Sequence, residues 1–306
     1  MSNTAAHTMH QNSPGRFTYS PLRWAIIVLF IICSIATDFI PGLTGMVFSL
    51  ISTLSVFALA ILHGKERYGF KSIIIFLIMT WVISNGLEGL SIQTGFPFGH
   101  YYYTVQSFNI WHVPFIIMPA YFGMGYMAWT LSQVLNGQFG RKLKGIYLFL
   151  VPFVASFIMV MWDVVMDPIQ STINKSWIWR NGGHYFGVPI SNYLGWFFVV
   201  YVFFQLFALY LSKFDKSESA LHKGKAFWFE AVAVYGLQSL SLLLTALVLH
   251  GHRDIYSSMG LVNIFTMVFV TLISLITIAN HPSLSASQRQ EDAQYQGNSE
   301  TQRRTS

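Results

Sequence analysis

Long apolar stretches alternate with short polar segments along most of this chain. A helix crosses a bilayer with about 17 to 25 mostly apolar residues, and eight stretches reach that length, at residues 22–40, 43–62, 71–90, 111–135, 144–166, 188–211, 226–249 and 259–279. The pattern predicts an all-α fold: a polytopic membrane helical bundle of about eight transmembrane helices within residues 21–282. An even number of spans places both termini on one side of the membrane.

Two polar ends, residues 1–20 and 283–306, flank the apolar region and are rich in Ser, Gln, Asn and Thr. They lack apolar periodicity, and we expect both to be disordered tails. The first apolar run is long for the core of a signal peptide, and no small-residue cleavage site follows it. We therefore expect this run to be retained as a signal anchor.

Composition and charge agree with a membrane location, because 53% of the residues are hydrophobic and only 10% are charged. Every Lys and Arg falls on the side of the termini except Lys175, Arg180 and Arg253. Short cytoplasmic loops carry an excess of these residues. Both termini are therefore predicted to be cytoplasmic, in a bacterial-type inner membrane. This asymmetry and contact with anionic lipid account for the net charge of +6, so no nucleic-acid partner is expected.

Residues that bind metals or cofactors are sparse in the sequence. The single cysteine, Cys33, excludes a disulfide within the chain and a cysteine metal cage. His250 and His252 are two residues apart and point to different sides of a helix, and no HxxxH or HxxHH pattern is present. The sequence also lacks GxGxxG and P-loop patterns. We therefore predict no metal and no cofactor.

Two loops on the side opposite the termini are unusually rich in aromatic residues and glycine. They are GFPFGHYYYT, from Gly95 to Thr104, and WIWRNGGHYFGVP, from Trp177 to Pro189. Loops of membrane proteins are usually short and polar, so this composition indicates a surface that holds a ligand at the membrane edge. The alternative is an interfacial aromatic belt that anchors helices at headgroup depth.

Ionisable residues in apolar runs are costly and mark candidate chemistry. Asp163 and Asp167, in WDVVMDP, are four residues apart and share one helix face, and Pro168 is expected to help close that helix. Two like charges on one face in a low dielectric are unfavourable, so one carboxyl is expected to keep its proton, as a general acid requires. Alternatively, Asp167 satisfies backbone donors of the loop while Asp163 bonds to a neighbouring helix.

Three further carboxylates lie in apolar runs or at their edges. Glu88 ends the third span, just before the first aromatic loop, and projects toward the same layer as the aspartate pair. Asp38 also falls near that face. Glu230 lies near the cytoplasmic end of the seventh span, where snorkelling or pairing with Lys225 is the simpler explanation.

A set of these residues resembles the integral-membrane carotenoid biosynthesis proteins, which include carotenoid and bisanhydrobacterioruberin hydratases. The set comprises Glu88, the run Thr94–Thr104, Val113–Pro114, Asp163, Asp167–Pro168, Trp177, Trp179 and the run Gly183–Trp196. The resemblance covers residues 80–200 well and the flanking spans only by hydropathy. It implies an enzyme that adds water to the terminal double bond of an acyclic carotenoid without a cofactor, with carotenoid and lipid bilayer as partners.

Hydration of such a bond needs an acid, walls that stabilise a tertiary cation, and water. The resemblance implies that Asp163 or Asp167 supplies the proton, and that Glu88 or the other aspartate orients the water. The residues expected to bind substrate are Phe96, Phe98, His100, Tyr101, Tyr102, Trp177, Trp179, His184, Tyr185, Asn192 and Trp196.

Two other functions fit the same residues. A membrane prenyltransferase would use the DxxxD spacing to hold magnesium and a diphosphate, with Lys175 and Arg180 as nearby cations. A carotenoid- or lipid-binding protein or a small transporter would use the aromatic loops as a binding rim without catalysis.

Overall fold

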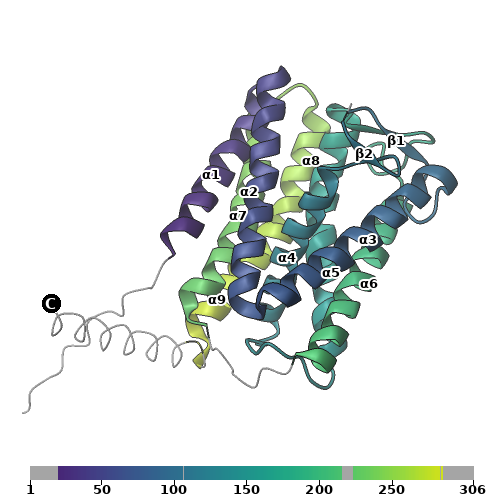
Figure 1. Ribbon diagram of the computed structural model, residues 1–306. Coiled ribbons are helices and arrows are strands. Elements are labelled where there is room, and N and C mark those ends of the chain that lie inside the picture. The colour runs from purple at the N-terminus through teal and green to yellow at the C-terminus, as the bar shows by residue number, and fades with distance from the viewer. Residues whose placement is uncertain (1–19, 106, 216–222, 283, 285–306) are drawn as a thin grey trace, which may run out of the picture.

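A computed structural model describes residues 20–105, 107–215, 223–282 and 284. The predicted tails, except Ser20 and Leu284, lie outside these residues. The described chain forms an all-α bundle of eight helices (Figure 1). Their bounds are α1 Pro21–Phe39, α2 Gly42–Tyr68, α3 Phe70–Thr94, α4 Ile117–Leu135, α5 Tyr147–Asp167, α6 Ile190–Phe214 and α7 Lys225–Val248, followed by one continuous rod made of α8 Arg253–Asn263, the π-helical turn Ile264–Val268 and α9 Phe269–Asn280.

Seven of these helices are long and apolar enough to cross a membrane, as a multi-pass integral membrane protein requires. The eighth, α4, does not reach the hydropathy of a membrane span, and almost every residue from Met118 to Val134 is buried. It packs against α2, α3, α5, α7 and α9. At Gly123 a side chain would collide with Val56, so glycine allows α2 to approach closely. Because α4 is surrounded by protein, it can carry polar and small residues that a lipid-facing helix would not.

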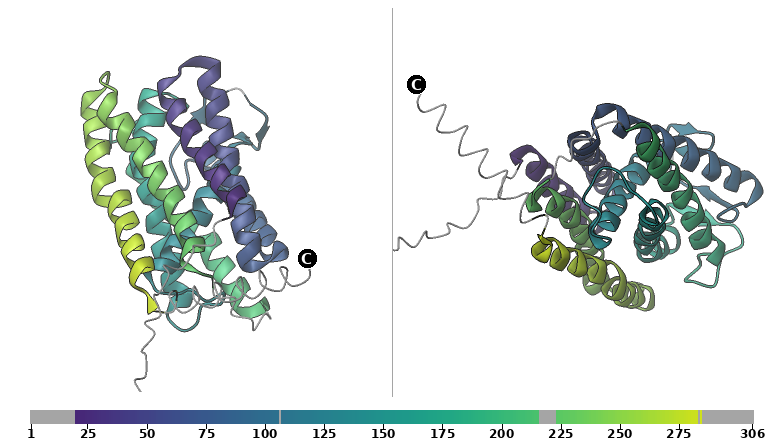
Figure 2. Two further views of the ribbon diagram at one scale, coloured as in Figure 1. Left: turned by 90° about the vertical axis from the view of Figure 1, so that its left-hand side faces the viewer. Right: turned by 90° about the horizontal axis from the view of Figure 1, so that it is seen from below.

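Successive helices run in alternating directions, so the two ends of the bundle carry different features. The described chain begins in α1 and leaves α9 at one end, and the aromatic loops lie at the other (Figure 1). The right-hand view in Figure 2 shows the bundle from below, at the end where the chain leaves α9. The two chain ends therefore share one side of the bundle, as the even number of spans predicts. Which side of the membrane this is remains a prediction.

The aromatic loops and the segment that follows the first of them form short antiparallel ribbons. In the described residues, β1 (Tyr101–Tyr103) pairs with β4 (Trp177–Trp179), and β2 (Asn109–Ile110) pairs with β3 (Val113–Pro114). The predicted span 111–135 therefore begins too early, because residues up to Pro114 belong to the β2–β3 hairpin and α4 starts at Ile117.

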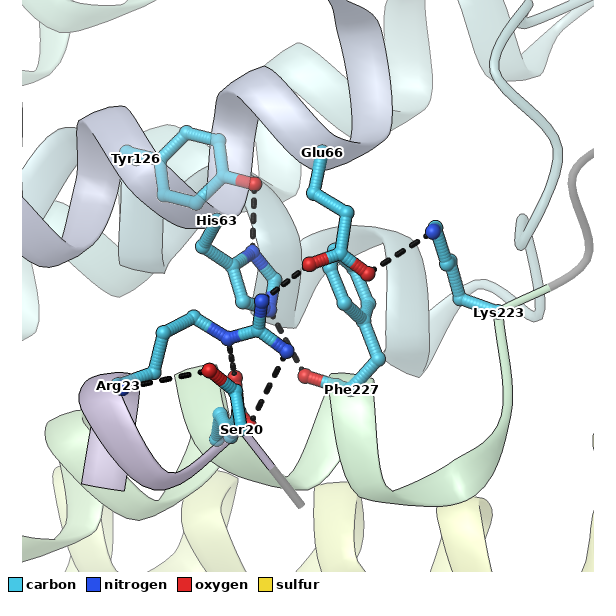
Figure 3. Close-up of polar contacts among 8 residues, drawn as sticks. Ser20, Arg23, His63, Glu66, Tyr126, Lys223 and Phe227 are labelled. Carbon is cyan, nitrogen blue, oxygen red and sulfur yellow. Dashed lines mark hydrogen bonds and ion pairs between the residues drawn. The ribbon is translucent and has the colours of Figure 1, made fainter. Parts of the chain in front are cut away.

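At the opposite end, charged side chains tie α1 to α2 and α7 (Figure 3). Glu230 is fully buried and accepts a hydrogen bond from Arg23 Nε at 2.5 Å. Arg23 also pairs with Glu66, whose other oxygen lies 2.9 Å from Lys223 Nζ. The expected pairing of Glu230 with Lys225 is wrong, because Lys225 Nζ instead donates to the carbonyl of Ala279. Glu230 is thus compensated by a cation from another helix, and it lies far from the aromatic loops.

Candidate active site

Three buried carboxyl groups meet at the end of the bundle that carries the aromatic loops. Glu88 comes from the last two turns of α3, and Asp163 and Asp167 come from the last turns of α5. Their exposed fractions are 4%, 1% and 1%. Asn192, in the first turn of α6, donates from Nδ2 to Asp163 Oδ2 at 3.0 Å and to Asp167 Oδ2 at 2.7 Å. The aspartate pair predicted from spacing therefore shares one face and one amide donor.

The chain beyond Asp167 does not leave the helix at once. The α-helical part ends at Asp167, and Pro168 begins a π-helical turn that extends to Ile173. Proline has no N–H to donate, so the α-helical hydrogen-bond ladder breaks at this point. The wider turn keeps the chain buried and carries it toward β4, which supplies a further donor to the site.

Glu88 is held by two phenols from different elements. Tyr121 of α4 donates to Oε1 at 2.6 Å, and Tyr103 of β1 donates to Oε2 at 3.3 Å. Burial raises the pKa of the Tyr103 hydroxyl well above its usual range, and the nearby Glu88 carboxylate adds to this shift. Tyr103 therefore keeps its proton and remains a hydrogen-bond donor at working pH.

Asp167 has its second oxygen occupied by the other aromatic loop. Trp177 Nε1 of β4 donates to Asp167 Oδ1 at 2.9 Å. The β1–β4 register places Trp177 directly opposite Tyr103 and Trp179 opposite Tyr101. The two loops singled out by composition therefore join into one ribbon, and each strand of that ribbon contributes a donor to a buried carboxylate.

Between these groups lies a mostly aromatic cavity of about 60 Å³. The Trp196 ring stacks on Tyr121 at a centroid distance of 4.3 Å and an angle of 4°, and Trp162 meets Trp196 edge-on. A water molecule needs roughly 10–15 Å³ of such space. The cavity therefore has room for a few waters or for the tip of a long chain, and its lining is Glu88, Phe98, Tyr101, Tyr103, Ile117, Ala120, Tyr121, Trp162, Asp163, Met166, Asp167, Trp177, Trp179, Asn192 and Trp196.

Nine of the residues expected from the sequence to form the site line this cavity. They are Glu88, Phe98, Tyr101, Asp163, Asp167, Trp177, Trp179, Asn192 and Trp196. Phe98 reaches it beside Gly195 of α6, where a Cβ atom would lie 2.8 Å from the Phe98 ring and from the Pro97 carbonyl. Glycine at this position allows the loop to pack directly on the helix.

Five other expected residues lie outside the lining. Phe96 and Tyr102 are 58% and 43% exposed, and His184 is also exposed. His100 is half-buried, and its backbone carbonyl accepts from the Arg180 N–H next to the ribbon. Tyr185 points toward α8, with its hydroxyl 3.7 Å from Met259 Sδ. Only some residues of each aromatic loop therefore line the cavity.

Six residues that line the cavity were not expected from the sequence: the aromatic Tyr103, Tyr121 and Trp162, and the apolar Ile117, Ala120 and Met166. Side chains alternate between the two faces of a strand. Reading Tyr101–Tyr103 as a strand would have paired Tyr103 with Tyr101 and placed Tyr102 on the other face. No local signal identified Tyr121, because its role depends on how α4 packs against α3.

The remaining carboxylate expected near this face, Asp38, has a separate role. It accepts a hydrogen bond from Thr245 Oγ1 at 2.5 Å and so links α1 to α7. Within the part of the chain that the structure describes, no group of three His, Cys, Asp or Glu side chains is placed to hold a metal ion.

Comparison with known proteins identifies the relatives of this chain. The family model of the carotenoid biosynthesis proteins matches residues 44–269. Bisanhydrobacterioruberin hydratase from Haloarcula japonica is 29% identical over 122 residues, which is 39% of either chain. The match thus spans about two fifths of that relative's length. No solved structure matches.

Proposed function

Because this chain belongs to the carotenoid biosynthesis protein family, we propose that it is a hydratase that adds water to the terminal C=C bond of an acyclic carotenoid end group. The hydratase name of the Haloarcula japonica relative supports this reaction class. The observation that carries the proposal is the set of three buried carboxyl groups on an aromatic cavity. A cavity of about 60 Å³ fits an end group, while the rest of a long polyene stays in the membrane.

Asp163 is the proton donor in this proposal. Both oxygens of Asp167 and both oxygens of Glu88 accept hydrogen bonds from side chains. Among the described residues, Asp163 accepts a side-chain hydrogen bond only at Oδ2. These hydrogen bonds favour the charged forms of Asp167 and Glu88. A third negative charge beside them would be unfavourable. The transferable proton therefore rests on Asp163, which has an oxygen free to reach a substrate carbon.

The aromatic walls and Glu88 serve the second half of the reaction. Transfer of the Asp163 proton to the less substituted carbon breaks the π bond and leaves a tertiary cation. Aromatic rings that line the cavity, Tyr121 and Trp196 among them, stabilise positive charge by cation–π interaction. Glu88 orients a water molecule, whose oxygen bonds to the cation. The proton lost by that water passes to the Asp163 carboxylate, which restores the starting state.

The two other functions considered from the sequence are less well supported. A prenyltransferase must hold a diphosphate, yet neither Lys175 nor Arg180 is among the cavity-lining residues. A protein that only binds carotenoid would have no use for a transferable proton. It therefore predicts that Asp163→Asn leaves function intact, whereas the hydratase predicts loss.

The test is expression in cells that accumulate an acyclic carotenoid such as lycopene, followed by chromatography and mass spectrometry of the pigments. The parent is expected to give a product heavier by one water. Asp163→Asn is expected to give none, because an amide cannot deliver a proton. The matched control is Asp254→Asn, which removes an exposed carboxylate at the same end of the bundle. Product from Asp163→Asn at the parent's level would contradict the proposed acid.

A further inference from the structure

One cross-strand pair of the β1–β4 ribbon contacts two different carboxylates. Tyr103 and Trp177 are direct partners in the antiparallel register, and their rings meet edge-on at a centroid distance of 6.1 Å. Tyr103 donates to Glu88 of α3, whereas Trp177 donates to Asp167 of α5. The ribbon therefore bridges the two helices that supply the acidic groups.

The ribbon is anchored on both sides of this pair. Beyond Tyr103, the Thr104 N–H donates to the Ser176 carbonyl at 3.1 Å, and the Thr104 hydroxyl donates to the Lys175 carbonyl at 2.5 Å. At the other end, the Arg180 N–H donates to the His100 carbonyl at 2.9 Å. Facing residues of antiparallel strands keep a fixed separation. A displacement of Tyr103 therefore also displaces Trp177, so the hydrogen bonds to Glu88 and Asp167 change together.

The hydrogen-bonding chemistry of Tyr103 and Trp177 suits residues that position a carboxylate. An indole N–H can donate a hydrogen bond but cannot accept one. The Tyr103 hydroxyl keeps its proton because burial and Glu88 raise its pKa. Each group therefore favours an ionised partner and offers no proton of its own to the substrate.

We propose that Tyr103 and Trp177 are one positioning unit, which fixes Glu88 and Asp167 as charged acceptors and so leaves the transferable proton on Asp163. The unit explains why both aromatic loops are needed at one site, since each supplies half of it. Its effect on turnover rests on the proposed hydratase function, but its effect on the carboxylates does not.

The direct test is infrared spectroscopy of the purified full-length protein in lipid nanodiscs. Carboxylate stretching bands report the hydrogen bonds that each group accepts. Glu88→Gln and Asp167→Asn assign the two bands by removing them. Tyr103→Phe, which deletes a single oxygen, is expected to shift the Glu88 band. Trp177→Phe is expected to shift the Asp167 band. Tyr102→Phe, on the exposed face of the same strand, is expected to shift neither.

The turnover test separates positioning from substrate binding. Loss of one hydrogen bond to a charged group is expected to lower kcat about tenfold or more. KM is expected to stay within about twofold, because the deleted hydroxyl of Tyr103 bonds to Glu88 and not to the substrate. If Trp177→Phe does not fold, Tyr103→Phe decides the test alone.

The outcomes distinguish this inference from the proposed function. Shifted bands in a protein that hydrates no carotenoid would support the unit and remove the hydratase proposal. If the parent protein hydrates its substrate but neither variant shifts its band, the positioning unit is wrong and the hydratase proposal is retained. A fall in kcat without a band shift would likewise overturn the unit.

Discussion

At the scale of single residues, the Asn192 amide determines how two aspartates share one buried site. Its NH₂ group has two hydrogens and donates one to each carboxyl. Without this amide, Asp163 would have no side-chain donor among the described residues, and Asp167 would keep the one from Trp177. Asn192 therefore stabilises the pair, and in the proposed reaction it sets the geometry for proton transfer.

Replacing Asn192 by Ala is expected to lower hydration activity by about tenfold to a hundredfold, because a buried charged group loses a hydrogen bond. The measurement is the initial rate with purified protein. Asn174→Ala is the matched control, since it removes an exposed amide from the same end of the bundle. Equal rates for the two variants would contradict the role of Asn192.

Tyr185 gives a prediction about pH and stability. Burial raises the pKa of its hydroxyl to about 12. In the unfolded chain this group loses its proton near pH 10, whereas in the folded protein it does so near 12. The folded state then holds more protons over that window, so its contribution to stability falls as the pH rises from 10 to 12. Apparent Tm in detergent should therefore decline less steeply for Tyr185→Phe than for the parent, and equal slopes would count against this assignment.

At the scale of elements, the loops are positioned by helices that allow close approach. Gly195 of α6 contacts Phe98 and Pro97, so an added methyl group must displace the loop. Gly86 of α3 has space, because the nearest atom to an added Cβ is 4.0 Å away. Substitution by alanine is therefore expected to have opposite effects at these two helix positions.

Gly195→Ala is expected to destabilise the protein by about 1–3 kcal/mol through overpacking and to lower activity through Phe98. Gly86→Ala is expected to be neutral or to stabilise by up to about 1 kcal/mol, because alanine favours a helix. Thermal unfolding in detergent and initial rates measure both effects. Comparable Tm values for the two variants would show that the loop does not depend on this contact.

The same elements show what the sequence could predict. The length of the apolar runs predicts the helices, and helical periodicity predicts that Asp163 and Asp167 share one helix face. The donors Tyr103 and Tyr121 could not be derived in this way, because strand register and the packing of α4 join residues distant in the chain. The same limit explains why Arg23, and not Lys225, compensates Glu230. Arg23 belongs to another helix, α1, whereas Lys225 is merely near Glu230 in the sequence.

At the scale of the whole molecule, basic residues are segregated along the bundle. Of the Lys and Arg side chains in the described residues, only Lys175, Arg180 and Arg253 lie at the end with the cavity. Short cytoplasmic loops carry an excess of these residues. The cavity is therefore predicted to open on the side of the membrane away from the cytoplasm.

Cysteine labelling tests this orientation. Cys33 is buried, and Cys33→Ser provides a background without cysteine. In that background, Asn181→Cys places an exposed thiol near the ribbon, and Lys144→Cys places one at the opposite end. A membrane-impermeant maleimide added to intact spheroplasts is expected to label only the first variant. Labelling of only the second would reverse the orientation.

The central claim is tested most directly by tracing the oxygen of the added water and the hydrogen that becomes bonded to carbon. Purified protein is incubated with an acyclic carotenoid in deuterated water enriched in heavy oxygen, and the product is analysed by mass spectrometry. The account predicts one solvent oxygen in the tertiary alcohol, one deuterium on the adjacent carbon, and neither in a folded Asp163→Asn variant. An unlabelled product would contradict hydration, and an equally labelled product from Asp163→Asn would contradict Asp163 as the proton donor.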